Sequence, residues 1–165
     1  MSIKTLSALT LASLVCLGAQ ASEVVRHKLP GNSTFPIALA VEIPATATVV
    51  NLSGAVPSVA DASAPKDSLN AYGDTQVQSE SVFNSIESSL KSLNLGMGDV
   101  IKMQVFLVGD PGQGGKMDFA GFMKAYTRHF GTAEQPNLPT RSVIQVAGLA
   151  NPGFLVEIEV TAVRR

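Results

Sequence analysis

The chain has 165 residues, 45% apolar and 15% charged, which suits a single domain with a hydrophobic core. Twelve basic residues are scattered among 13 acidic ones, for a net charge of −1. Apart from Arg164 and Arg165 the sequence has no basic run, so it lacks the clustered positive charge that nucleic-acid binding requires. We therefore expect no nucleic-acid partner.

The first 21 residues have the order of a secretory signal peptide. Residues 1–4 carry one lysine, residues 5–18 are apolar, and Ala19-Gln20-Ala21 predicts cleavage after Ala21. The apolar run is shorter than the roughly 20 residues that span a bilayer.

We predict one domain over residues 22–165, periplasmic or secreted, with no membrane attachment after cleavage. Because Cys16 is removed, that domain has no thiolate nucleophile, disulfide or cysteine-based zinc site.

The first half of the domain reads as three strands and a helix. Residues 23–29, 37–43 and 47–52 are short β-like runs, and Ser53-Gly54 begins a polar, turn-rich segment. Thr75 and Gln78 have the spacing of a capping box. Apolar residues then recur at helical spacing until Gly96, at Val82, Ile86, Leu90 and Leu93.

The second half reads as strand, helix and two strands. Residues 99–108 are nearly all apolar, which indicates a strand buried on both faces. A second amphipathic helix follows, marked by Phe119, Phe122, Met123, Tyr126 and Phe130. The order βββαβαββ predicts an α+β domain, with two helices packed on one face of a mixed sheet.

Two other motifs point to no site. The loop GDPGQGGKM lies between a strand and a helix, but a phosphate-binding loop needs glycine where Asp110 stands and serine or threonine where Met117 stands. His27 and His129 have no ligand partners at metal-site spacing, so we expect no metal. His129 is expected to pack the end of the second helix.

The closing strands carry the charges that need an explanation. Glu157 and Glu159 lie on one face of the strand, and Val156, Ile158 and Val160 lie on the other. The face with the glutamates is either exposed to solvent or part of a site. If these two strands form a hairpin, Arg141 lies four residues from the level of Glu157, about 13 Å away. A direct ion pair between Arg141 and Glu157 is then not expected.

The chain resembles the RidA (YjgF) family of reactive-intermediate deaminases. The resemblance covers residues 35–165 and is carried in order by AYGDTQVQSESVFNSIESSLKSLNLGMGDVIKMQVFLVGD, DFAGFMKAYTRHFG, LPTRSVIQVAGL and VEIEVTAVRR. Its most specific part is P-x-R-S-x-x-x-V followed by E-I-E. The resemblance implies a chorismate-mutase-like fold, a homotrimer with ligand clefts between subunits, and cofactor-independent hydrolysis of 2-imino acids, such as 2-aminoacrylate, to 2-keto acids and ammonia.

The resemblance also implies roles for residues. The family arginine matching Arg141 holds the substrate carboxylate, a task that a planar guanidinium suits. The glutamate matching Glu157 positions water and handles protons, and the turn matching Ser53-Gly54 lines the cleft with backbone groups. A cleft shared between subunits would let Arg141 and Glu157 meet one ligand.

Three wall positions depart from the family. Ile37 stands where many active members have tyrosine, Val143 where they have cysteine, and Met123 where a substrate-contacting asparagine is expected. These departures predict a bulkier, less polar substrate, or binding without turnover. Two hypotheses follow: an exported imine or enamine deaminase, and a non-catalytic exported trimer that binds a small carboxylate or protects other proteins. Ribonuclease activity, reported for some relatives, is disfavoured by the charge pattern.

Overall fold

The order of elements is the predicted one. The structure, a computed structural model, describes residues 23–164. The strands are β1 (Val25–Lys28), β2 (Ala38–Glu42), β3 (Thr48–Ala55), β4 (Val100–Val108), β5 (Thr140–Val146) and β6 (Val156–Arg164). The helices are α1 (Thr75–Ser92) and α2 (Phe119–His129), with single 3-10 turns η1 (Leu69–Ala71), η2 (Met97–Asp99) and η3 (Pro111–Gln113). The predicted signal peptide lies outside the described residues.

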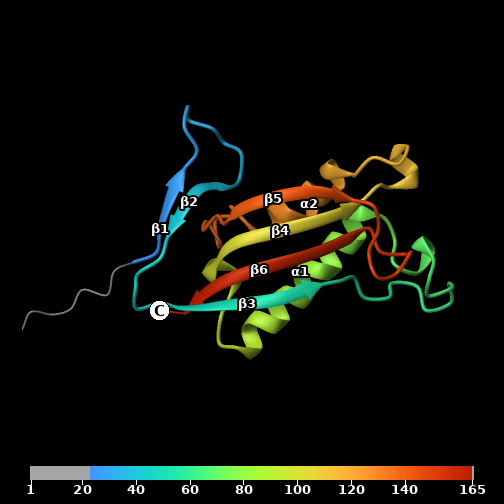
Figure 1. Cartoon of the computed structure of the whole chain (residues 1–165), viewed down its shortest axis with the longest axis horizontal. Helices are drawn as coiled ribbons and strands as arrows, with labels where there is room; N and C mark the ends of the chain where they lie inside the picture. The colour runs from blue at the N-terminus through green and yellow to red at the C-terminus, as the bar shows by residue number, and fades with distance from the viewer. Residues whose placement is uncertain (1–22, 165) are drawn as a thin grey trace, which may run out of the picture.

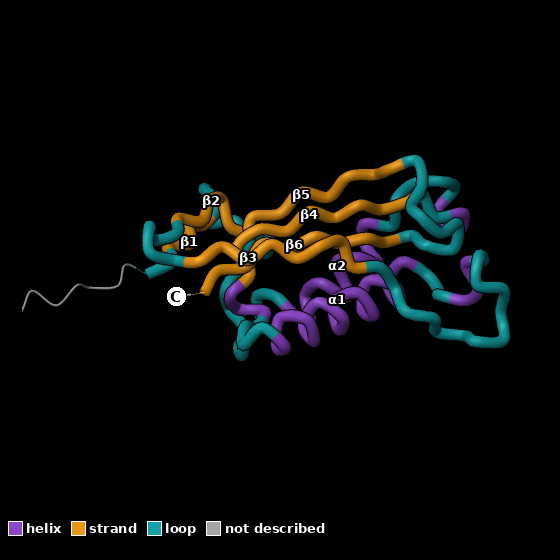
Figure 2. The backbone as a smooth tube through the Cα atoms, turned by 60° about the horizontal axis from the view of Figure 1, so that its bottom comes forward, coloured by secondary structure: helices purple, strands orange, loops and turns teal. Residues whose placement is uncertain are grey.

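The sheet is built from the last four strands and is covered by helices on one face only. Its order is β3-β6-β4-β5, in which β4 and β5 run parallel and the other pairs antiparallel. Both helices pack beneath this sheet (Figures 1 and 2). The predicted α+β class with two helices on one face of a mixed sheet is confirmed. The strands β1 and β2 form a separate two-stranded sheet that projects from one end (Figure 1).

The last two strands do not form the hairpin that the sequence left open for them. Strand β4 lies between β5 and β6 and pairs with both. The parallel β4-α2-β5 crossover places β5 on one side of β4, which leaves the other side to β6. The burial prediction for β4 holds for one face only, because Met103, Val105 and Leu107 are buried while Gln104 and Phe106 are half-buried.

The core lies between the sheet and the helices, with aromatic rings at its centre. Phe83 of α1 lies 6.0 Å, centroid to centroid, from Phe122 and 6.2 Å from Tyr126 of α2. His129 ends α2 with its ring 5.0 Å from Phe83, which agrees with the expected packing role. Within residues 23–164 no helix is long and apolar enough to cross a membrane.

The start of α1 differs from the predicted capping box. Asp74, rather than Thr75, is the N-cap, and its carboxylate accepts a hydrogen bond from Val77 N at 2.9 Å. Gln78 is fully buried and points into the fold instead. Its Nε2 donates to Gly73 O and Gly153 O, each at 2.9 Å, and its Oε1 accepts from Leu155 N at 2.7 Å. This side chain therefore ties α1 to the segment that leads into β6.

Candidate functional site

Arg141 lies on β5, on the face of the sheet that the helices cover. Its Cα partner on β4 is the buried Met103, and side chains of paired residues share a face. The guanidinium carbon lies 4.1 Å from the ring centroid of Tyr126 and 5.2 Å from that of Phe122, with Phe35 at 5.5 Å and Phe119 at 5.9 Å. These distances are within the range of cation–π attraction. Four rings from α2 and the segment before β2 thus surround one cation.

The aromatic surroundings also affect protonation. Burial raises the pKa of Tyr126 to about 12, against the opposing charge of Arg141. The Tyr126 hydroxyl therefore stays protonated at neutral pH and donates a 2.7 Å hydrogen bond to Pro36 O. Burial likewise lowers the pKa of Arg141, an effect opposed by Tyr126. The Nη1 atom of Arg141 is shielded from solvent and finds no hydrogen-bond acceptor within residues 23–164.

The predicted apolar wall residues lie on the same side of the sheet as Arg141. Ile37 lines a hollow of about 300 Å³ together with Arg141. Val143 follows Arg141 by two residues on the same face of β5, and its Cα partner is Val105 of the core. Met123 is half-buried on α2, next to Phe122. Ile37 thus shares a hollow with Arg141, whereas Val143 and Met123 pack against the core on the same side of the sheet.

Glu157 lies on the opposite face of the sheet. It pairs with Phe106 on β4, while its neighbours Val156 and Ile158 point into the core. One chain therefore does not bring Glu157 and Arg141 into the same hollow. Their separation results from the sheet itself, because they lie on different faces as well as at different levels along the strands.

Ser53 and Gly54 accompany Glu157 rather than Arg141. The predicted turn at these residues is wrong: β3 continues to Ala55, and the register with β6 shifts between Leu52 and Ala55, as in a bulge. A Cβ atom on Gly54 would overlap Oε1 of Glu157. The bulge thus places the Glu157 carboxylate directly over a glycine, where no side chain displaces it.

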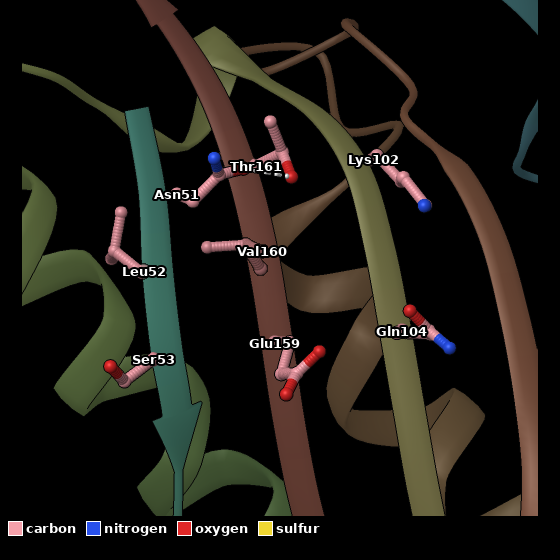
Figure 3. Close-up of a pocket in the computed structure, with 8 residues that line it drawn as sticks. All are labelled: Asn51, Leu52, Ser53, Lys102, Gln104, Glu159, Val160 and Thr161. Carbon is pink, nitrogen blue, oxygen red and sulfur yellow. Dashed lines mark hydrogen bonds between the residues drawn. The ribbon is translucent and has the colours of Figure 1, made fainter. Parts of the chain in front are cut away.

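The helix-free face of the sheet carries mostly polar side chains. A hollow of about 400 Å³ on this face includes Ser53, Lys102, Gln104 and Glu159 (Figure 3). Beside them the Thr161 hydroxyl donates to Asn51 Oδ1 at 2.9 Å across β6 and β3. Lys102 and Glu159 stand two strand positions apart, at the levels of Thr161 and Gln104 respectively. The face therefore presents both signs of charge.

The remaining sequence motifs have structural roles. Asp110 uses its carboxylate within its own loop, accepting from Gly112 N at 2.7 Å, which argues against a phosphate site. Nε2 of His27 on β1 forms a 2.6 Å hydrogen bond with Oε1 of Glu42 on β2. No group of three or more histidine, cysteine, aspartate or glutamate side chains in the described part of the chain could hold a metal.

Comparison with known proteins shows which family this arrangement represents. Residues 36–164 match the model of the Endoribonuclease L-PSP family, which includes the YjgF and RidA proteins. The chain belongs to this family. A RutC family protein from Leuconostoc mesenteroides subsp. cremoris is 29% identical over 100 residues, which cover 61% of this chain and 72% of that protein.

Solved structures of RidA proteins resemble the chain in fold. E. coli TdcF with bound serine has a TM-score of 0.55 and 28% identity, covering 81% of this chain and 91% of that one. A Rid family protein from Yersinia pestis has a TM-score of 0.60 and 21% identity, covering 83% and 96%. The chorismate-mutase-like architecture expected from the sequence is thereby confirmed.

The rings around Arg141 are the feature that the sequence did not predict. Phe119, Phe122 and Tyr126 were interpreted only as the core face of a helix, and Phe35 was given no role. Helical spacing shows which residues share a face but not which strand residue lies above them. The only feature of the sequence that pointed to this contact was the family resemblance, in which the strand that carries the arginine follows this helix.

Proposed function

We propose that this RidA protein is a cofactor-independent imine or enamine deaminase that hydrolyses 2-imino acids to 2-keto acids and ammonia. The observation that carries the proposal is the Arg141 guanidinium, which aromatic side chains surround and whose side chain lines a hollow with Ile37. Among residues 23–164 no acidic residue lines this hollow, and a substrate carboxylate that enters it can accept hydrogen bonds from the guanidinium. The serine bound by E. coli TdcF also carries a carboxylate.

Glu157 is the proposed acid–base group. In the proposed step, Glu157 takes a proton from water as the water oxygen adds to the imine carbon. Glu157 returns that proton to the nitrogen of the carbinolamine, and then accepts the hydroxyl proton as the carbon–nitrogen bond breaks, ammonia leaves and the keto carbonyl forms. Glu157 is half-buried and its carboxylate lies over Gly54 in the β3 bulge, where the glycine places no side chain between it and a water molecule. No cofactor is needed, because a protonated imine is already electrophilic.

The proposed active site is shared between copies of the chain in a homotrimer. Arg141 and Glu157 lie on opposite faces of one sheet, so a single chain supplies two separate halves of a site. The helix-free face, with Lys102 and Glu159 of opposite charge, offers a surface on which another copy could pack. Its packing would bring Glu157 of one chain to Arg141 of another.

A second candidate function is binding without turnover, as a trimer that takes up a small carboxylate or protects other proteins. The apolar Ile37 beside Arg141 favours it, as do Val143 and Met123 on the same side of the sheet, since these side chains offer no groups that bind a reacting nitrogen.

For either function we propose that the protein acts in the periplasm or outside the cell, after cleavage of the signal peptide. N-terminal sequencing of protein recovered from its host should then give Ser22 as the first residue.

The decisive experiment measures imine loss directly. Imino acids are generated by an amino-acid oxidase in the presence of semicarbazide, and the protein competes with the trap. We expect faster imine loss with wild type, and no acceleration with Arg141→Ala or Glu157→Gln.

Matched controls test whether these losses are specific. Arg128→Ala removes an exposed arginine from α2, and Glu87→Gln changes a glutamate of α1 that pairs with Lys91. Both controls should keep the acceleration. Equal rates with and without wild-type protein would contradict deaminase activity, and carboxylate binding that depends on Arg141 would then support the second function.

A further inference from the structure

Apolar side chains are exposed beside the cation of Arg141. Phe35 is 42% and Leu39 58% exposed, although Phe35 lies only 5.5 Å from the guanidinium carbon. Leu39 lines a hollow together with Arg141 and Ile37, while Phe35 stands two residues before Ile37 and contacts the guanidinium. Single exposed apolar residues are common, but several gathered beside one cation indicate a surface that binds something. A ligand that binds here must cover the ring of Phe35 and also bring negative charge to the Arg141 guanidinium.

The hollow next to Arg141 has one polar and one apolar side. Strands β4 and β5 contribute the polar side with Thr140 and Arg141 and with Lys102 and Ser142 from neighbouring positions, and the buried Met103 lies among them. The segments that flank the β1–β2 loop contribute the apolar side with Leu29, Ile37, Ala38 and Leu39. A ligand that matches both sides has an anionic end and an apolar body.

The position of the apolar side is fixed by long-range hydrogen bonds. Pro36 O accepts from the Tyr126 hydroxyl at 2.7 Å, and Ala38 N donates to Pro139 O at 2.9 Å. Phe35 and Ile37 flank Pro36, so both are held beside α2 and the start of β5. Tyr126 also lies 4.1 Å beneath the guanidinium, so the same ring positions the cation and the apolar segment.

We propose that Phe35 is a specificity-determining residue, which together with Ile37 selects 2-imino acids with a large apolar side chain, branched or aromatic, over those with short or hydroxylated ones. The inference rests on the proposed function, in which Arg141 holds the substrate carboxylate. With that end fixed, the substrate side chain extends over Phe35 and Ile37, where apolar contact is favourable and a hydroxyl would lose its hydrogen bonds to water.

The test compares imines from leucine, phenylalanine and alanine in the semicarbazide competition assay. Each extra methylene in an apolar pocket changes selectivity by roughly 10- to 200-fold, so wild type should prefer the leucine imine over the alanine imine by at least about 10-fold. Phe35→Ala should lower kcat/KM for the leucine and phenylalanine imines by about 10-fold and change the alanine imine by less than about 3-fold. Phe35→Leu should keep most of the preference.

The control is Leu93→Ala, which truncates an apolar side chain that is 38% exposed at the far end of α1. It should leave the selectivity ratio unchanged. An alanine imine processed as fast as the leucine imine would overturn the proposal. So would a Phe35→Ala variant that slows all three imines equally, or one that changes the oligomeric state in light scattering while the selectivity stays the same.

A binding measurement separates this inference from the deaminase proposal. Calorimetry would compare 4-methyl-2-oxopentanoate with pyruvate, two stable 2-keto acids that need no turnover. Tighter binding of the larger acid, with the difference lost in Phe35→Ala, supports the inference even if no imine is hydrolysed. Equal affinities, or no binding of either acid, would refute it whatever the kinetics show.

Discussion

Gly54→Ala should strongly lower the proposed imine turnover without removing any functional group. A Cβ at this position would overlap Oε1 of Glu157 and lie 2.9 Å from its Cδ and 3.1 Å from its Cγ. Carbon atoms in ordinary contact stay about 3.5 Å apart, so the carboxylate must move by roughly 1 Å. The displaced atoms are the end of a flexible side chain, and the backbone need not follow.

The expected magnitudes differ for activity and stability. Misplacing a reacting group by about 1 Å can cost 10²-fold in rate, so imine turnover should fall by about that factor. The free energy of unfolding should change by less than about 1 kcal/mol, since no core atom is lost. Turnover is measured by semicarbazide competition and stability by urea denaturation, with Glu157→Gln assayed in parallel.

The matched control is Gly96→Ala. Gly96 has an extended φ of −133°, and no heavy atom lies within 4 Å of the position that its Cβ would occupy. This variant should match wild type in both assays. If Gly54→Ala kept full turnover while Glu157→Gln lost it, the position of the carboxylate over the bulge would have no bearing on catalysis.

Three further predictions concern stability and are checked by chemical denaturation. The pKa of Tyr126 is raised to about 12, so its stabilising effect is full below about pH 10 and is lost as pH rises to 12. The free energy of unfolding of wild type should fall by roughly 2 kcal/mol over that interval. In Tyr126→Phe the part of this fall that comes from Tyr126 should be absent. Gln78→Leu leaves Leu155 N buried without an acceptor and should cost about 2–4 kcal/mol, whereas a neutral result would show that the region repacks. Asp74→Ala removes the α1 cap and should cost about 1 kcal/mol, and an unchanged midpoint would contradict the capping role.

The elements and their buried faces could be predicted from the sequence, but the neighbours of each strand could not. Alternation in β6 correctly placed Glu157 away from Val156 and Ile158. The same alternation does not reveal which strands pair with β6, and proximity in sequence suggests pairing with β5. In the structure β4 lies between β5 and β6, because β5 follows a helix and runs parallel to β4.

The sequence singles out the candidate residues but does not predict their geometry. The resemblance identified Arg141 and Glu157, yet their positions on opposite faces depend on strand pairing. The contact of Gly54 with Glu157 depends on a bulge, and one extra residue in a strand has no distinct pattern. Gln78 likewise matched a capping motif but serves a long-range connection that only the tertiary structure shows.

The place of β6 within the sheet has a consequence for the order of folding. The last strand along the chain lies in the interior of the sheet and joins β3, more than 100 residues earlier, to β4. A nascent chain therefore cannot assemble these four strands until β6 has left the ribosome. Removal of β6 would divide the sheet into two parts, so a chain truncated before Val156 should fail to fold rather than form a slightly smaller domain.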